Sequence, residues 1–114
     1  MNSVKKNKIK RGEIRFNYRH GHLGHIKKIY KEQGIRKASS VFISSKEFDD
    51  GKPNIPMKKN IKYNNVDKSY FIKRIRTYPL KTYSKEKIKD KLSLFDKRIS
   101  NQIYKQYLKN KKRR

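Results

Sequence analysis

The sequence predicts an α+β fold: a small curled antiparallel sheet or SH3-like barrel of four to five strands, followed by a C-terminal amphipathic helix. Two observations lead to this prediction. In the first two thirds of the chain, Ile, Tyr and Phe alternate with polar residues, which is typical of half-buried strands. In the last third, apolar residues recur at every fourth position, which places them on one face of a helix.

The first expected strand is the stretch RGEIRFNY. Its apolar residues Ile14, Phe16 and Tyr18 alternate with polar ones, so one face is expected to be buried. The following stretch, RHGHLGH, is expected to be a loop between two strands, because Gly21 and Gly24 tolerate tight backbone turns.

The second and third strands are expected to form a long hairpin. HIKKIYKE has apolar residues at Ile26, Ile29 and Tyr30, and Gly34 is placed to make the turn into IRKASSVFISS. Next, KEFDDGKPNIP has the signals of a loop, namely an Asp-Gly pair and prolines. A short strand around Ile55 and Met57 is expected next, and KKNIKYNNVDKS is expected to be a second loop or an edge element.

The last strand and the helix complete the fold. SYFIKRIRTYPL interleaves apolar with basic residues and ends at Pro79, which cannot continue a central strand. In LSLFDKRISNQIYKQYLKN, the side chains of Phe95, Ile99 and Ile103 are expected to face the sheet. Ser93, with an acid three positions later, resembles a capping box at the start of the helix.

The charge of the chain points to its partner. Lys and Arg number 34 against 9 acidic residues, which gives a formal net charge of +25. Such a charge repels itself in the compact state unless a polyanion neutralises it. Nucleic acid is the expected partner, because bound cations release its condensed counterions. We therefore expect one nucleic-acid-binding domain at residues 11–109, with a basic arm at 1–10 and a basic tail at 110–114.

Other classes are excluded by what the sequence lacks. There is no Cys, so disulfide scaffolds, thiol chemistry and zinc knuckles are excluded. No stretch is apolar enough to span a membrane or to lie on one as an anchor, and the N-terminus shows no signal-peptide core. We expect a cytoplasmic protein with no membrane partner and no cofactor.

All three histidines lie within RHGHLGH. A metal site is not expected, because a glycine-containing loop gives the rings no rigid geometry and the neighbouring cations repel a metal ion. Two interpretations remain open. In one, the loop only contacts phosphate. In the other, His20 and His22 transfer protons during RNA cleavage, since imidazole titrates near neutral pH and arginine stabilises charge on phosphate.

Basic residues interleaved with aromatic ones are the broader signal. Cations can follow a phosphate backbone while aromatic rings stack on unpaired bases. The predicted nucleic-acid-binding residues are Arg15, Arg19, His25, Lys27, Lys28, Lys73, Arg74, Arg76, Tyr78 and Tyr83.

The order of these segments resembles the PemK-like toxin endoribonucleases (the MazF and Kid group) over residues 10–110. That family opens with an Arg-Gly-acid-Ile strand, matched here by KRGEIRFNY. HGHLGH and VFISSK stand where the family has a glycine-containing loop and a Thr/Ser element, and KSYFIKRIRTYPL stands at its serine-led strand with an Ile-Arg pair. The resemblance implies an SH3-like barrel, often a homodimer, that cuts single-stranded RNA without metal and has an antitoxin as protein partner.

The resemblance also implies site residues. Ser44 stands where the family uses Thr or Ser near the scissile phosphate, and Arg76 matches the arginine of the Ile-Arg pair. The family's Arg-Pro pair after the first loop is replaced by LGHIKK, so Arg19, His20 or His22 would take over its role. The catalytic residues of a nuclease would then be His20, His22, Ser44 and Arg76.

Two functions therefore remain open. The first is a binder without catalysis that engages RNA through phosphate contacts, as part of a ribonucleoprotein or in competition with one, or DNA within a larger complex. The alternative is metal-independent cleavage of single-stranded RNA. An architectural binder of duplex DNA is less favoured, because no recognition helix is evident.

Overall fold

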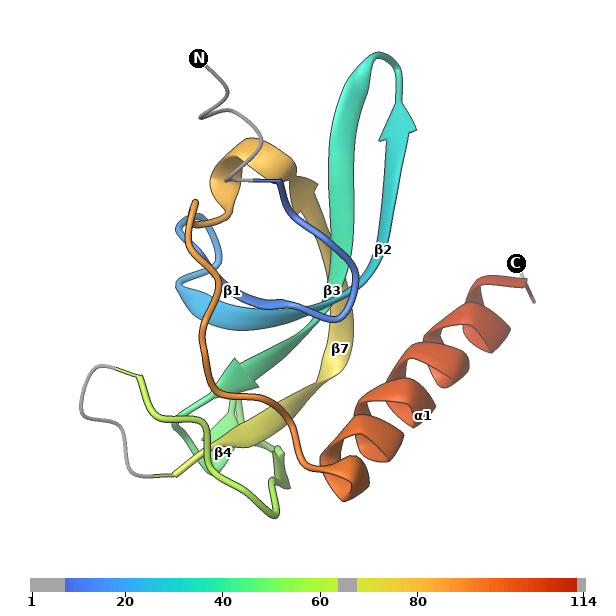
Figure 1. The fold of residues 1–114 in the computed structure, drawn as a ribbon. Coiled ribbons are helices and arrows are strands. Elements are labelled where there is room, and N and C mark those ends of the chain that lie inside the picture. The colour runs from blue at the N-terminus through green and yellow to red at the C-terminus, as the bar shows by residue number, and fades with distance from the viewer. Residues whose placement is uncertain (1–7, 64–67, 113–114) are drawn as a thin grey trace.

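The computed structural model describes residues 8–63 and 68–112. In chain order, the elements are β1 (Ile14–Asn17), β2 (His22–Glu32), β3 (Ile35–Ser44), β4 (Phe48–Asp49), β5 (Lys52–Pro53), β6 (Ile55–Pro56), β7 (Tyr70–Pro79), the 3-10 helix η2 (Leu80–Thr82) and α1 (Leu94–Lys112) (Figure 1). Residues 1–7 of the expected arm, 113–114 of the expected tail and 64–67 of the expected second loop lie outside the described residues.

The main sheet has five antiparallel strands in the order β1-β2-β3-β7-β6, and α1 packs on one of its faces (Figure 1). The α+β class and the antiparallel sheet are confirmed, but the alternative of a barrel is wrong, because the sheet does not close. Pro79 ends β7, and the chain turns through η2 before it reaches the outer edge of β1. There it makes separate backbone hydrogen bonds, such as Ser84 N to Phe16 O and Ile88 N to Ile14 O, both 2.8 Å.

The predicted hairpin of β2 and β3 is confirmed. Its turn has positive φ angles at Gln33 (52°) and Gly34 (78°), as two-residue hairpin turns require. However, β2 begins at His22, so the second half of the expected RHGHLGH loop is strand. Gly24 has a packing role within this strand. A Cβ at this position would lie 2.9 Å from the Phe42 ring, so only glycine fits the cross-strand packing.

The stretch KEFDDGKPNIP was expected to be a loop, and this is wrong in part. β4 and β5 form a second, two-stranded sheet around a turn at Asp50 and Gly51, where φ is 52° and 76°. β6 then pairs with β7, with Ile55 opposite Phe71, as expected for the short strand around Ile55 and Met57, but the strand ends at Pro56 and does not include Met57.

Apolar side chains pack on both faces of the sheet. The cluster between the sheet and α1 includes Ile14, Leu23, Val41, Ile43, Met57, Ile61, Phe71, Ile75 and Leu92, with Ile99 and Ile103 of the helix against it. The opposite face carries a smaller cluster of Ile26, Ala38, Phe42, Ile72 and Tyr83. Alternate residues of β7 therefore serve different faces, and Arg76 shares the face of Ile72, away from the helix.

The inward face of α1 is only partly the predicted one. Ile99 and Ile103 pack on the core as expected. The prediction that Phe95 also faces the sheet is wrong, because this residue is 49% exposed. The fully buried helix residues are polar, namely Asp96 and Ser100. No helix of the described chain is both long and apolar enough to cross a membrane.

The predicted cap at Ser93 is confirmed, but Asp96 accepts from the Ser93 hydroxyl and not from the Ser93 backbone N–H as in a full capping box. Ser93 Oγ accepts a hydrogen bond from Asp96 N (3.1 Å) and donates one to Asp96 Oδ2 (2.8 Å). The same carboxylate accepts the backbone N–H groups of Lys58 (2.8 Å) and Lys59 (3.0 Å). Asp96 thus stabilises the first turn of the helix, and it also holds the segment that follows β6 against α1.

Candidate nucleic-acid interface

Two histidines are in direct contact where β1 turns into β2. The Nδ1 atoms of His20 and His22 lie 2.9 Å apart. The turn that brings them together is fixed by Asn17, whose side-chain oxygen accepts His20 N and whose carbonyl accepts Gly21 N, both at 2.8 Å. Because one Nδ1 must donate and the other accept, the pair holds one proton between the two rings.

His20 is also held by aromatic neighbours. Its ring stacks on Phe42 with centroids 4.1 Å apart and an angle of 14°, and it meets Tyr78 edge-on at 5.8 Å. Burial, followed by the neighbouring His22 and Arg76, lowers the pKa of His20 to about 4, against the opposing effect of Asp49. His20 is therefore neutral near pH 7 and can accept a proton or a hydrogen bond.

A pocket of about 340 Å³ opens beside His20 on the face away from α1. We call it the arginine pocket. The β4–β5 hairpin forms one wall and β7 the other, and the polar lining includes His20, Asp49, Lys52, Asn54, Arg74 and Arg76. Arg74 and Arg76 point to the same face because they are two residues apart on one strand.

A second pocket, of about 200 Å³, opens beside His22. We call it the serine pocket, because Ser44, Ser45 and Ser69 line it together with His22 and aromatic side chains. Its aromatic wall is the stacked pair Phe16 and Tyr63, with ring centroids 5.6 Å apart.

The two histidines therefore connect the four predicted catalytic residues. His22 and Ser44 line the serine pocket, whereas His20 and Arg76 line the arginine pocket. Since the two rings touch, the pockets adjoin at the histidine pair. Arg19 lies in the preceding turn with an exposed side chain, in neither of the two pockets.

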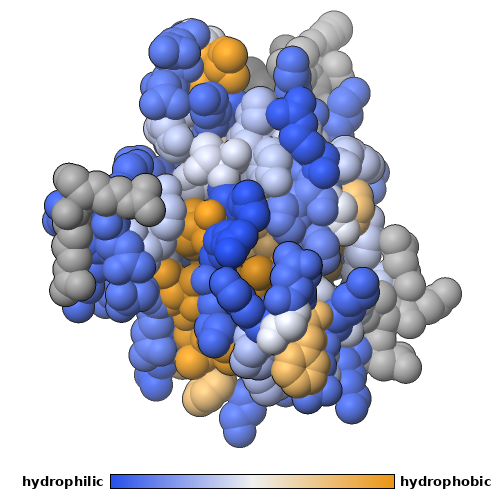
Figure 2. Space-filling model, turned by 180° about the vertical axis from the view of Figure 1, so that it is seen from behind, coloured by the Kyte–Doolittle hydropathy of each residue, from blue (hydrophilic) through white to orange (hydrophobic). Residues whose placement is uncertain are grey.

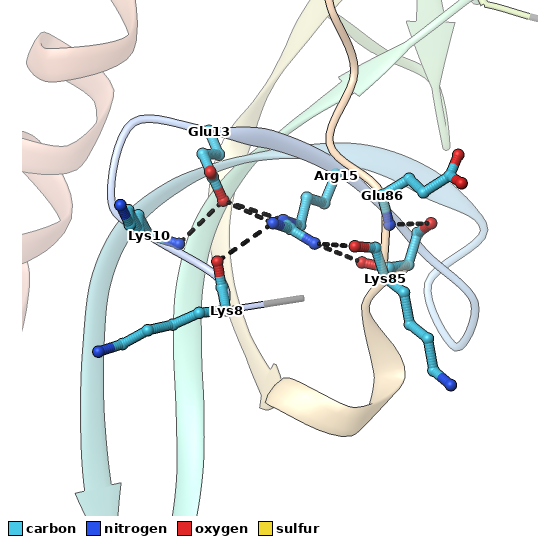
Figure 3. Close-up of polar contacts among 7 residues, drawn as sticks. Lys8, Lys10, Glu13, Arg15, Lys85 and Glu86 are labelled. Atoms are coloured by element: carbon cyan, nitrogen blue, oxygen red, sulfur yellow. Dashed lines mark hydrogen bonds and ion pairs between the residues drawn. The ribbon is translucent and has the colours of Figure 1, made fainter. Parts of the chain in front are cut away.

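Arg15 does not fit its predicted role in nucleic-acid binding. Only 2% of it is exposed, and its guanidinium pairs with Glu13 at 3.0 Å (Figure 3). The same group donates to the carbonyl oxygens of Lys8 (3.3 Å), Ser84 (3.0 Å) and Lys85 (2.7 Å). Arg15 thus ties the first described residues to the segment after η2, and its donors are occupied.

His25 and Tyr83 are buried as well, which corrects the same expectation. His25 Nδ1 lies 2.6 Å from Ser100 Oγ of α1, and its ring is 4% exposed. Tyr83 Oη lies 2.7 Å from Ser40 Oγ, and burial raises the pKa of this phenol to about 12. Both side chains join elements of the fold and are not open to a ligand.

The other predicted binding residues remain accessible. Arg19, Lys28, Lys73, Arg74 and Arg76 are exposed, and Lys27 and Tyr78 are half-buried. Sequence reasoning missed Lys52 and Asn54, which the β4–β5 hairpin brings to the arginine pocket. The Asp-Gly pair was the signal for that hairpin, because it is a preferred hairpin turn.

Most cations of the described chain have no anionic partner. Within residues 8–63 and 68–112 there are two ion pairs, Arg15 with Glu13 and Lys37 with Glu32. The face opposite to the view of Figure 1 is largely hydrophilic, with hydrophobic residues exposed between hydrophilic ones (Figure 2). An excess of cations without anionic partners attracts anionic ligands.

The described part of the chain shows no group of three or more His, Asp or Glu side chains that could hold a metal ion. Comparison with protein-family models, with curated proteins and with solved structures finds no match to this chain. The resemblance to PemK-like toxins therefore stays a prediction, and function is argued from the two pockets.

Proposed function

We propose that this protein binds single-stranded RNA through the arginine and serine pockets, as part of a ribonucleoprotein or in competition with one. The observation that supports the proposal is that a basic pocket and a pocket with an aromatic wall adjoin at the contact between His20 and His22. Arg74 and Arg76 supply forked donors for phosphate oxygens on one side of the histidine pair. Phe16 and Tyr63 supply aromatic surface for an unpaired base on the other side.

A single strand fits this arrangement better than a duplex. The serine pocket has about 200 Å³, which admits one flat group that has left a stack but not a base pair within a helix. The exposed cations around the arginine pocket, such as Lys73, contact the backbone without reading its sequence.

The test is binding of labelled oligonucleotides by fluorescence anisotropy. Arg74→Gln/Arg76→Gln is compared with Lys31→Gln/Lys105→Gln, which removes the same charge from exposed positions outside both pockets. We expect the first variant to raise the Kd for single-stranded RNA about tenfold or more, and the second about twofold. Equal effects of the two variants, or tighter binding to duplex than to single strand, would contradict the proposal.

Cleavage of the bound strand is a second candidate, favoured by the contact between His20, which lines one pocket with Arg76, and His22, which lines the other with Ser44. In such a reaction one imidazole takes the 2′-hydroxyl proton and the other protonates the leaving 5′-oxygen. The lowered pKa keeps His20 unprotonated near pH 7, as the accepting role requires, but it also makes the imidazole a weaker base than one with a pKa near 7. Arg76 stabilises the charge on the phosphorane, and the Ser44 hydroxyl hydrogen-bonds a phosphate oxygen. This is the activity that the resemblance to PemK-like toxins implies.

Cleavage is tested by incubating single-stranded RNA with the protein in chelator. A nuclease yields defined products that His20→Ala and His22→Ala abolish, while the Kd changes less than about threefold, because proton transfer acts in the transition state. Intact RNA with wild-type protein that binds it would leave binding without catalysis as the function.

A further inference from the structure

A second basic concavity lies on the α1 face of the sheet. Two hollows of about 290 and 270 Å³ share Arg11 and Gly12 in their walls. We call them together the helix-side cleft, whose main side chains are Arg11, Lys27, Lys87, Lys89, Lys97 and Tyr104. None of these residues lines the arginine or the serine pocket.

The chain builds this cleft by a short alternating segment before α1. In Figure 1 this segment passes β1 on its way to the helix. Ile88 donates its N–H to Ile14 O (2.8 Å) and packs on the core, as does Leu92. The lysines on either side of Ile88, Lys87 and Lys89, are therefore turned outward and exposed.

The helix forms the facing wall. The buried contact of His25 with Ser100 fixes α1 against β2, and Lys27 of β2 donates to Asn101 of α1. Tyr104, one helical turn further on, lines the hollow that holds Arg11 and Lys27.

The cations of the cleft form no ion pair within residues 8–63 and 68–112. The side chains of Arg11, Lys87, Lys89, Lys91 and Lys97 make no hydrogen bond or ion pair with the described residues. The two acids in the wall are directed elsewhere: Glu13 accepts from Arg15 and Lys10, and Asp90 accepts from Lys62 N at 2.9 Å. Like charges around one hollow repel each other until an anion enters it.

We propose that the helix-side cleft is a second binding site for the phosphate backbone of a nucleic acid, so that the ligand contacts both faces of the sheet. This inference rests on the proposed RNA binding. A nucleic-acid strand is favoured over a membrane surface because the site is recessed. Lys27 is half-buried between β2 and α1, where a phosphodiester can reach it but a planar bilayer cannot. Tyr104, stacked on Tyr107 at 6.2 Å, gives the rim an aromatic surface for a base.

The experiment uses the full chain and a single-stranded RNA of about twenty nucleotides, with binding measured over a range of NaCl concentrations. The variant Lys87→Gln/Lys89→Gln is compared with the matched control Lys31→Gln/Lys105→Gln. We expect the cleft variant to raise Kd about fivefold or more and to make the plot of log K against log salt shallower by roughly 1.4, since each phosphate contact in a single strand contributes roughly 0.7. The control is expected to change Kd about twofold and to leave the slope nearly unchanged.

Each outcome separates the two proposals. If the wild type does not bind RNA, the proposed function fails and the second site fails with it. If the wild type binds and the cleft variant behaves like the control, only the second site is wrong. Sedimentation with vesicles of phosphatidylcholine and phosphatidylserine gives a further check: loss of vesicle binding in the cleft variant, with RNA affinity equal to that of the control, would assign the cleft to lipid headgroups instead.

Discussion

At the scale of single residues, charge alone does not tell which cations meet a ligand. Arg15 stands in an exposed-looking alternation in the sequence, yet its guanidinium is buried with Glu13 and three carbonyl oxygens. The acceptors come from the start of the described chain and from Ser84 and Lys85, which are remote in sequence. Such long-range partners cannot be inferred from spacing, whereas Arg76 is exposed and stays a predicted binding residue.

Replacing this arginine is expected to destabilise the fold without a specific effect on binding. Arg15→Met removes the donors from three carbonyl groups and leaves Glu13 without its partner, which costs about 3 kcal/mol. Arg19→Met, at an exposed position, is the matched control and is expected to cost less than about 0.5 kcal/mol. Urea unfolding followed by circular dichroism measures both. Equal stabilities of the two variants would mean that the Arg15 network is not maintained in solution.

His25 is expected to make folding sensitive to acid. Burial, together with the nearby charges of Lys27 and Lys97, lowers its pKa to about 3. The unfolded chain, with an ordinary pKa of 6.5, therefore binds more protons than the folded one between these values. Its contribution to stability is complete above the unfolded pKa and is lost as the pH falls from 6.5 toward 3.

The measurement compares wild type with His25→Gln by urea unfolding at several pH values. Gln keeps a hydrogen-bonding group toward Ser100 but cannot be protonated. Between about pH 6.5 and 4.5, the wild type is expected to lose on the order of 2–3 kcal/mol more than the variant. Parallel pH profiles would show that the imidazole is not buried in its neutral form.

At the scale of elements, strands with regular alternation and the helix were predictable, and their exceptions have physical causes. The hairpin turn at Gly34 and the cap at Ser93 are local signals, and both were predicted correctly. The start of β2 was placed too late because Gly24 suggested a loop, whereas the glycine makes room for Phe42 of the neighbouring strand. β4 and β5 were missed because two residues are too few to show alternation.

The buried face of the helix was predicted only in part, because two of its most buried positions, Asp96 and Ser100, are polar. Asp96 and Ser100 point inward since the chain after β6 and His25 of β2 offer them hydrogen bonds. The apolar pattern therefore predicted that Phe95 is buried, whereas the buried residue in this turn is Asp96. A sequence shows which side chains are polar, but it does not show which of them will find a buried partner.

Asp96 is expected to contribute more to stability than an ordinary helix cap. Asp96→Ala leaves the N–H groups of Lys58 and Lys59 and the Ser93 hydroxyl without their acceptor, which costs about 3 kcal/mol. Ser93→Ala removes only the cap and is expected to cost about 1 kcal/mol. Both are measured by urea unfolding. If the two variants lose the same stability, the carboxylate acts as a cap only and does not anchor the segment after β6.

At the scale of the whole molecule, the net charge of +25 acts across dimensions of 44 × 40 × 26 Å. From this charge the composition predicts a polyanionic partner, but it gives no position for such a ligand on the fold. The fold brings Arg74 and Arg76 to one face of the sheet and Lys87 and Lys89 to the side of α1. With few acids available to form ion pairs, the free protein is under electrostatic repulsion that salt or a polyanion relieves.

Salt is therefore expected to act in opposite directions on folding and on binding. Repulsion between exposed charges extends over a Debye length of about 30 Å at 0.01 M salt but only about 8 Å at 0.15 M. Added NaCl is therefore expected to weaken the repulsion across the molecule and to raise the Tm of the free protein. The same salt weakens RNA binding, because counterion release is less favourable when the salt concentration is high. Five phosphate contacts would give a slope of log K against log salt of roughly −3.5 for single-stranded RNA. Differential scanning fluorimetry and anisotropy over the same salt range measure the two effects. A Tm that falls with NaCl would show that ion pairs outweigh repulsion in the folded state, and an RNA affinity that is insensitive to salt would remove the electrostatic basis of both binding surfaces.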